Sequence, residues 1–288
     1  MAQINAMIAA HQLGVHNTLL TKALERLSSG YRINHAADDP SGLAFADKFR
    51  TQIRSLQQAS RNITQASSFI RTAEDGLTQI LNLLFDVRDL ALEASNSTQS
   101  NSDRLVNQSE IDQLLTEIDR LATAVKFNGM RLLNGAFAST PPRGKVVVPY
   151  GGGSFFGSVI FHVGASEGNT IRAYISTQTA EAMGVNIIRV TSATLASFSV
   201  GLANSAIGRI LERRGRIGGF EERLDIAKTI SDLQVTSLES AESAVRDADT
   251  AAEIVNFTKQ QIQVQAATAM LAQANLISQS VLLLFAKL

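Results

Sequence analysis

The feature that most constrains this chain is a helical period that persists over about fifty consecutive residues. Apolar residues recur at steps of 3, 4 or 7 from Phe45 to Ala94, the spacing that places side chains on one face of an α-helix. Asp39 precedes this stretch in the N-cap position, and Pro40 stands at the first helical position, where its missing N–H costs nothing. A helix of this length would extend roughly 80 Å, too far for an ordinary globule.

A second helical pattern occupies the N-terminal segment and ends at Gly30. Leu13, Leu20, Leu24 and Leu27 follow steps of 7, 4 and 3, which is the spacing of a coiled-coil seam. Gly30 suits the left-handed conformation that ends many helices. The following "YRINHAAD" has neither helical nor strand periodicity. The sequence therefore predicts an irregular crossing between two helices, each with a chemically defined end.

Further helices are predicted on both sides of the middle of the chain. After the break "SNSTQSNSD", Ser102 or Asp103 is expected to cap a third helix, which ends at the Asn-Gly turn of residues 128–129. A fourth long pattern starts near Ile207, with a kink or loop predicted at residues 215–219, "GRIGG". The third helix has an apolar side of Leu105, Ile111, Leu114 or Leu115, Ile118, Leu121 and Val125. The final seam consists of Leu238, Ala241, Val245, Ala248, Ala252, Val255, Ile262, Ala266, Ala269, Leu276 and Leu283.

Residues 136–200 differ from the rest. They hold three of the four prolines and the short β-branched or aromatic runs "KVVV", "SVIFHV" and "TIRAYIS", the last two separated by the turn-like "GASEGN". This pattern predicts a small β-hairpin subdomain, followed by a helical turn at "TAEAMGV". Because long helices flank it on both sides, we expect a helical rod with a central insertion.

Composition narrows the classes of function. The formal net charge is +0 and aromatic residues make up 6%, so neither a basic field nor an aromatic platform favours nucleic acid. The absence of cysteine removes disulfides, zinc–thiolate sites and cysteine nucleophiles. His11 and His16 lack the i, i+4 spacing of helical zinc ligands, and no phosphate-binding or nucleophile motif occurs. We expect no enzyme, no metal site and no cofactor.

The two ends of the chain carry no charged side chain. Residues 1–21 and 260–286 contain no Asp, Glu, Lys or Arg. The glutamines of the second stretch argue against membrane insertion, since each amide would enter hydrocarbon, and the N-terminus lacks the pattern of a secretory signal peptide. The two ends either form a helical pair within one chain, or they remain unfolded until other copies of the chain bury them, as in a self-assembling filament.

Five blocks of the sequence resemble bacterial flagellin. They cover both terminal thirds and read "LERLSSGYRINHAADDPSGLAFADKFRTQIRSLQQASRN", "DVRDLALEASNSTQS", "SEIDQLLTEIDRLATAVKFNGMRLLNG", "LESAESAVRDADTAAEIVNFTKQQI" and "QAATAMLAQAN…SQSVLLL". The middle, with "FHVGASEGNTIRAYI" and "AMGV", is most similar to spirochaete-type core flagellins.

The resemblance implies a mainly α fold, a long antiparallel helical coiled-coil rod built from both chain ends. Residues 1–40 would form an inner-tube helix and spoke, 41–135 and 201–245 the rod helices, 136–200 a β-hairpin region without large outer domains, and 246–288 the second inner-tube helix. The spoke and its caps would comprise Gly30, Arg32, Asp38, Asp39 and Pro40. Filament-core packing is expected of Leu13, Leu20, Leu24, Leu27, Val255, Ile262, Ala266, Ala269, Leu276 and Leu283.

The resemblance also implies partners and a location. The chain would polymerise with itself below a filament cap and above hook-junction proteins, and a chaperone would hold residues 245–288 before assembly. Export would use the flagellar type III apparatus without cleavage. The filament would be extracellular, or periplasmic in a spirochaete. The alternatives are a hook–filament junction protein, a flagellin-like helical binding protein and, least favoured, an enzyme carried by the central insertion.

Three segments depart from the family pattern. "ANLISQ" replaces the usual "ANQ-x-P-Q", and "LLLFAKL" replaces the usual ending. The third is the epitope that innate receptors recognise in some flagellins, with the pattern Q-R-x-R-E-L. Arg88, Asp89 and Leu90 fit its second half, and Glu110 matches the partner glutamate on the next helix. Phe85 and Asp86, however, stand where glutamine and arginine are expected. Because this reverses a charge at a contact, weak receptor activation is predicted.

Overall fold

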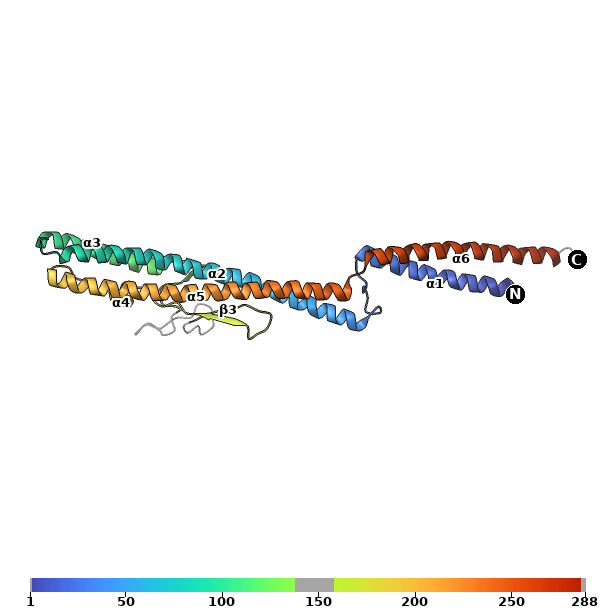
Figure 1. Cartoon of the computed structure of the whole chain (residues 1–288), viewed down its shortest axis with the longest axis horizontal. Coiled ribbons are helices and arrows are strands. Elements are labelled where there is room, and N and C mark those ends of the chain that lie inside the picture. The colour runs from blue at the N-terminus through green and yellow to red at the C-terminus, as the bar shows by residue number, and fades with distance from the viewer. Residues whose placement is uncertain (1, 138–157, 286–288) are drawn as a thin grey trace. The chain divides into compact units, whose positions relative to one another are not determined.

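The computed structural model describes residues 2–137 and 158–285, which form a mainly α-helical fold (Figure 1). The helices are α1 (Ala2–Ser29), α2 (Pro40–Ser95), α3 (Asn101–Ala124), α4 (Ala180–Met183), α5 (Ala193–Arg246) and α6 (Thr250–Phe285). The strands are β1 (Lys126–Phe127), β2 (Met130–Arg131), β3 (Val159–His162) and β4 (Thr170–Ala173). They pair as two antiparallel hairpins, β1 with β2 and β3 with β4. The predicted fold class is confirmed.

The chain divides into two compact units. One contains Met1–Ile53 with Thr236–Leu288, and the other contains Arg54–Val235. The dividing points fall inside α2 and α5, so each of these helices contributes residues to both units. The predicted boundaries at residues 40, 135, 200 and 245 are finer than this division and remain predictions.

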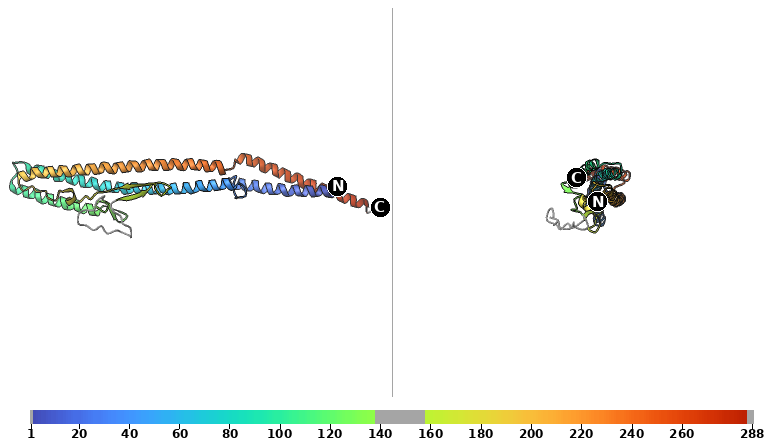
Figure 2. Two further views of the ribbon diagram at one scale, coloured as in Figure 1. Left: turned by 90° about the horizontal axis from the view of Figure 1, so that it is seen from below. Right: turned by 90° about the vertical axis from the view of Figure 1, so that its left-hand side faces the viewer.

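The first unit is dominated by α1 and α6, which lie side by side and run in opposite directions (Figures 1 and 2). The N-terminal end of α1 therefore lies beside the C-terminal end of α6. At the other end of the pair, residues 30–39 lead from α1 into α2, and residues 247–249 lead from α5 into α6. Both crossings thus belong to this unit.

The core of the second unit is built from one face of α2. Its fully buried residues follow the predicted helical period, from Ile63 through Leu77 to Ala94, and they pack with buried residues of α3 and α5. The ring of Phe69 makes edge-on contacts with Phe127, Phe137 and Phe161 at centroid distances of 5.6, 5.8 and 5.6 Å. Such aromatic contacts add to the burial of apolar area and fix the hairpins against α2.

The middle of the chain matches the predicted hairpin where it is described. Val159 pairs with Ala173 and His162 with Thr170, with "GASEGN" as the turn. Gly184, at φ 70°, caps α4 in the left-handed conformation. In the β1–β2 turn, Asn128 and Gly129 both have positive φ, as a two-residue hairpin of the I′ type requires. The predicted "KVVV" strand lies outside the described residues.

Two details predicted for α3 are wrong. Its cap is Ser100 rather than Ser102 or Asp103, because Ser100 Oγ accepts the Asp103 N–H while the Asp103 carboxylate accepts the Ser100 N–H. This reciprocal pair is a capping box, and it places Asp103 at the third helical position. Leu105 is 59% exposed instead of joining the apolar side, whereas Ile111, Leu115 and Ile118 are buried.

The predictions for α5 were wrong in two places as well. The helix begins at Ala193 rather than near Ile207, since small buried residues at 196, 199 and 203 keep the helical period there. It also runs without a break through "GRIGG". Each glycine costs a helix about 1 kcal/mol, but Ile217 and Leu224 are buried on the opposite face and offset that cost.

Candidate functional site

Over 2–137 and 158–285, no group of three or more His, Asp or Glu side chains is placed to hold a metal ion. Three open surface grooves are each lined by a single helix, on α5, α3 and α6 respectively. None of the helical segments so described has the length and apolar character needed to cross a bilayer. The candidate site is the α1–α6 pair together with its two crossings.

The surface that joins α1 to α6 follows a strict heptad on both helices. On each helix, one row of buried and half-buried residues advances by alternate steps of three and four positions. This is the pattern of two helices packed in a coiled coil. We call these residues the inner seam. On α1 it comprises Ala6, Ala9, Leu13, His16, Leu20, Ala23 and Leu27. On α6 it comprises Glu253, Phe257, Gln260, Val264, Ala267, Leu271 and Ala274.

The predicted packing residues of α1 divide between this seam and the surface. Leu13, Leu20 and Leu27 are half-buried in the inner seam. Leu24 is 53% exposed, and Ala23, which is buried, occupies the seam position in its place. The predicted steps of 7, 4 and 3 thus combine residues from two faces of α1.

The predicted packing residues of α6 lie away from α1. Val255 is 68% exposed and Ile262 and Leu276 are each 60% exposed, while Ala266 and Ala269 are also exposed. We call these five residues the outer stripe. The side chain of Leu283 lies outside the described residues. Helix α6 therefore presents two apolar rows, one against α1 and one uncovered.

The two crossings are bonded to each other through the backbone. The Arg32 N–H donates to the carbonyl of Arg246 at 2.7 Å, and the Ala248 N–H donates to the carbonyl of Gly30 at 2.9 Å. Tyr31 and Asp247 form an isolated antiparallel bridge between these bonds. The Arg32 guanidinium adds a bond to the carbonyl of Val245 at 2.7 Å. Since all these groups sit at helix ends, the bonds satisfy atoms that no helix can pair.

Arg246 holds the centre of this joint. Its guanidinium lies over the ring of Tyr31, 4.3 Å from the centroid, and its Nε donates to the carbonyl of Ile33 at 3.4 Å. A guanidinium on an aromatic face is a favourable cation–π contact. Arg246 is also the last residue of α5, where a positive charge interacts favourably with the helix dipole.

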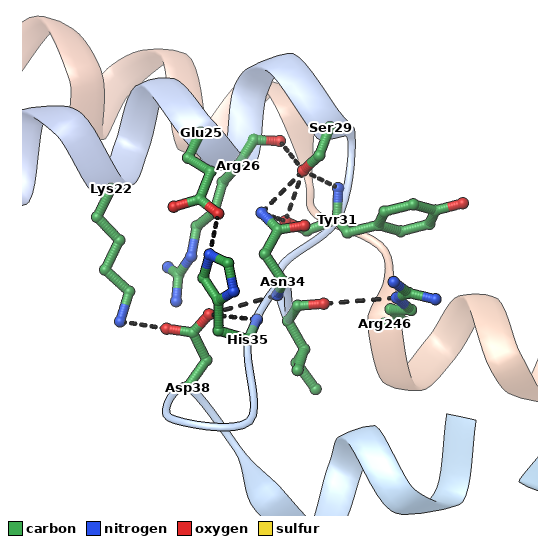
Figure 3. A network of polar contacts seen from close by, with 10 residues as sticks. Lys22, Glu25, Arg26, Ser29, Tyr31, Asn34, His35, Asp38 and Arg246 are labelled. Carbon is green, nitrogen blue, oxygen red and sulfur yellow. Dashed lines mark hydrogen bonds and ion pairs between the residues drawn. The ribbon is translucent and has the colours of Figure 1, made fainter. Parts of the chain in front are cut away.

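The crossing of residues 30–39 is tied back to α1 by one ion pair and one histidine–carboxylate contact (Figure 3). Lys22 Nζ contacts Asp38 Oδ1 at 2.5 Å, and His35 Nε2 contacts Glu25 Oε1 at 2.7 Å. Asp38 Oδ2 also accepts the backbone N–H groups of Asn34 and His35 at 3.3 Å. The bond from Lys22, helped by these two N–H groups, lowers the pKa of Asp38 to about 2.

The start of α2 is sealed by Asp39. Its Oδ1 accepts the N–H groups of Ser41 and Gly42 at 3.1 and 2.9 Å, and the bond from Gly42 is the largest cause of its lowered pKa. Pro40 is the first helical residue. A Cβ at Gly42 would overlap the Asp39 carboxylate and the side chain of Ile33, so the close turn requires glycine. Gly30, with φ 74°, occupies the left-handed end of α1.

Sequence reasoning missed the second half of this joint. It carried the final seam through residues 247–249, where the structure ends α5 and starts α6. The signal was present at Asp249, whose Oδ1 accepts the N–H groups of Ala251 and Ala252 at 2.9 and 3.2 Å as an N-cap. The apolar spacing on both sides concealed it. The contact of Arg246 with Tyr31 has no local signal, since it joins residues far apart in the chain.

The residues of the predicted receptor epitope lie on α2 and α3. Asp86 and Glu110 are exposed, and Leu90 is half-buried against the core. Arg88 binds Asp89 at 2.7 Å and lies over the ring of Phe85, 5.3 Å from its centroid. Arg88 is thus held by its neighbours, and weak receptor activation remains a prediction.

Comparisons with known proteins were made for the whole chain. The bacterial flagellin N-terminal helical region matches residues 2–138, and the bacterial flagellin C-terminal helical region matches residues 200–285. Flagellin FlaB1 of Treponema pallidum is 41% identical over 285 residues, which cover 97% of this chain and 96% of the relative. The flagellar filament 33 kDa core protein of Treponema phagedenis is 40% identical with the same coverage.

A solved structure of a putative flagellar hook-associated protein from Vibrio parahaemolyticus has a similar fold. The TM-score is 0.57, with 15% identity, and the match covers 73% of this chain and 100% of that chain. At this identity the likeness concerns the fold alone.

Proposed function

The chain belongs to the bacterial flagellin family, and from this premise we propose how its two ends hold a filament together. It is a structural subunit of the flagellar filament, which self-assembles and gives motility. We propose that the α1–α6 pair forms the inner tube of that filament and that other copies of the chain cover the outer stripe. The joint at residues 30–39 and 247–249 would be the spoke that leads to the next layer.

The observation that carries this proposal is the uncovered outer stripe on α6, a helix that has no charged side chain from Gln260 to its end at Phe285. Val255, Ile262 and Leu276 recur at intervals of seven and fourteen residues, so they form a continuous row. On α1, Ile4 and Met7 are likewise exposed. Residues 1–21 and 260–286 have no charge to keep such surfaces in water. Continuous apolar surface of this kind is typical of an interaction site.

The remaining partners follow from the family. We propose that a chaperone holds residues 245–288 before assembly, that the subunit leaves the cell through the flagellar type III apparatus, and that it adds to the filament below a cap. The filament is proposed to lie outside the cell, with a periplasmic filament as the alternative in a spirochaete. An electron micrograph of sectioned source cells would distinguish the two locations.

A charge placed in the outer stripe tests the assembly proposal. Ile262→Asp is expected to raise the concentration needed for filament growth by at least tenfold, because the interface would bury an unpaired carboxylate. The matched control is Gln261→Asp, which adds the same charge at the neighbouring exposed position. Heat-dissociated subunits are mixed with short filament seeds, and polymer is measured by sedimentation and negative-stain microscopy.

The control is expected to assemble within about twofold of the parent. If Ile262→Asp assembled as readily as Gln261→Asp, the outer stripe would not be an interface between copies. If the unaltered chain only capped seeds without elongating them, the junction-protein alternative would replace the filament subunit.

A further inference from the structure

The inner seam has a periodicity that leaves its own alignment ambiguous. Its positions repeat every heptad on both helices. On each helix, three of the four seam positions farthest from the joint are alanine or leucine. If α6 were displaced along α1 by one heptad, about 10 Å, apolar residues would again meet apolar residues. The apolar pattern alone therefore gives little preference for one alignment over the next.

One polar pair interrupts the seam. His16 Nδ1 lies 3.0 Å from Gln260 Oε1, and both side chains are half-buried between the helices. Since a glutamine oxygen only accepts, the histidine nitrogen carries the hydrogen. Nearer the joint, Arg26 lies 4.0 Å from Glu253, which is buried. The polar contacts of the seam are thus few, and each has a specific partner.

We infer that His16 and Gln260 select the register in which α1 and α6 pair. A displacement by one heptad in one direction would place His16 opposite Ala267 and Gln260 opposite Ala23, so both polar groups would lose their partner inside the seam. Displacement in the other direction would bring His16 to Glu253, but it would leave Gln260 opposite Ala9 and separate Glu253 from Arg26. A polar pair at a seam position is a general device for fixing register.

The joint does not perform this task by itself. Its bonds tie the start of α6 to the first crossing at Ala248, whose N–H donates to the carbonyl of Gly30. Gln260 lies several turns further along, in the segment without charged residues. This inference rests on the proposed function in one respect: if the ends fold during assembly, each incoming chain must find its register then.

Cysteine pairs can report the register, because the chain has no cysteine of its own. In an antiparallel pair with His16 opposite Gln260, Leu13 is level with Val264, and a one-heptad displacement brings Leu13 level with Leu271. The native reporter is therefore Leu13→Cys with Val264→Cys, and the shifted reporter is Leu13→Cys with Leu271→Cys. Each reporter is combined with the parent, with His16→Leu/Gln260→Leu, and with the control Asn17→Leu/Gln261→Leu, which alters two exposed neighbours.

The full-length chains are oxidised after assembly, and intramolecular disulfides are quantified by mass spectrometry of the cross-linked peptides. The parent and control are expected to form the native disulfide with little of the shifted one. His16→Leu/Gln260→Leu is expected to raise the shifted disulfide roughly tenfold, since one unmet polar contact corresponds to about one decade in an equilibrium constant.

Two results would overturn the inference. In the first, His16→Leu/Gln260→Leu would keep the shifted disulfide at the parental level. In the second, it would lose both disulfides, which would mean that the pair is needed for pairing as such and not for register. Filament formation is scored separately by electron microscopy, and disulfides are counted in the sedimented filaments. A chain that forms filaments with the wrong disulfide is thereby distinguished from a chain that forms none, so the two proposals fail separately.

Discussion

Asp38 ties the first crossing to the helix that precedes it. Its carboxylate accepts a bond from Lys22 and two backbone N–H groups, and these hold its pKa at about 2 in place of the ordinary 3.8. A carboxyl whose pKa is lowered by folding stabilises the folded form at pH values above its ordinary pKa. That contribution is lost as the pH falls from about 4 to about 2.

Asp38→Asn should therefore weaken the joint most at neutral pH. We expect a loss of about 1 kcal/mol, less than the full pKa shift implies because Lys22 is half-exposed and screened by solvent. The temperature at which filaments dissociate should fall for the variant at pH 7, and the gap from the parent should close between pH 4 and pH 2. Asp47→Asn, at an exposed position of α2, is the control. A gap that stays constant over this range would show that Asp38 is not the responsible group.

Two glycines in long helices should respond oppositely to the same substitution. A Cβ at Gly76 would lie 2.8 Å from Leu133 Cδ1 and 2.9 Å from Val125 Cγ2, whereas a Cβ at Gly208 would meet nothing within 4 Å. Gly76→Ala should destabilise the free subunit by about 1–2 kcal/mol despite its better helix propensity, and Gly208→Ala should stabilise it by about 0.5–1 kcal/mol. Urea unfolding measures both, and an equal stabilisation by both would contradict the close packing at Gly76.

Among the elements, the α2–α3 turn depends on one buried arginine. Arg104 is 8% exposed. Its Nε donates to the carbonyl of Ala94 at 2.9 Å, and one terminal nitrogen donates to the carbonyl of Asn96 at 3.0 Å. The side chain thus pairs the Ala94 carbonyl, which α2 leaves free at its C-terminal end, and a carbonyl of the turn that follows. It also places a positive charge at the negative end of the helix dipole.

Arg104→Met should cost about 2–3 kcal/mol in the free energy of unfolding, because buried carbonyl groups would lose their charged donor. Arg120→Met on the same helix is the matched control. Arg120 binds Glu117 at 2.6 Å on an exposed surface, where solvent screens such a pair and it contributes little to stability. Similar losses for the two variants in urea unfolding would mean that Arg104 does not secure the turn.

Elements with a local signal could be predicted from the sequence. Asp39 and Pro40 marked the start of α2, the 3–4 spacing marked its length, and Asn128–Gly129 marked the first hairpin. Features set by distant residues could not be predicted. The continuity of α5 through its glycines depends on burial of Ile217, and the face on which Leu24 lies depends on where α6 packs. In both cases the sequence shows the apolar spacing of the helix, but it does not show which distant residues pack against that helix.

In the whole molecule, the uncharged terminal segments should be less well folded in the free subunit than in the assembled filament. In the free subunit, α1 and α6 bury less apolar surface on folding than they would in a filament, because the outer stripe of α6 stays exposed. The two helices should therefore be only marginally stable in the free subunit. Hydrogen exchange of the free subunit should be fast in residues 2–21 and 260–285 and slow in the core around Leu77. Assembly should protect the ends. Slow exchange there in the free subunit would contradict the proposal that neighbours drive their folding.

The short crossing at residues 247–249 has a consequence for the phase of α6. Each residue of an α-helix advances it by about 100° about its axis. One residue inserted in the first turn of α6, after Ala251, would therefore rotate everything after it relative to the bond that anchors Ala248 to Gly30. The rest of the α6 sequence would be intact, yet Phe257 and Val264 would point away from α1. The number of helical residues between the anchored crossing and the inner seam thus decides which row of α6 turns inward and which is left for neighbouring chains.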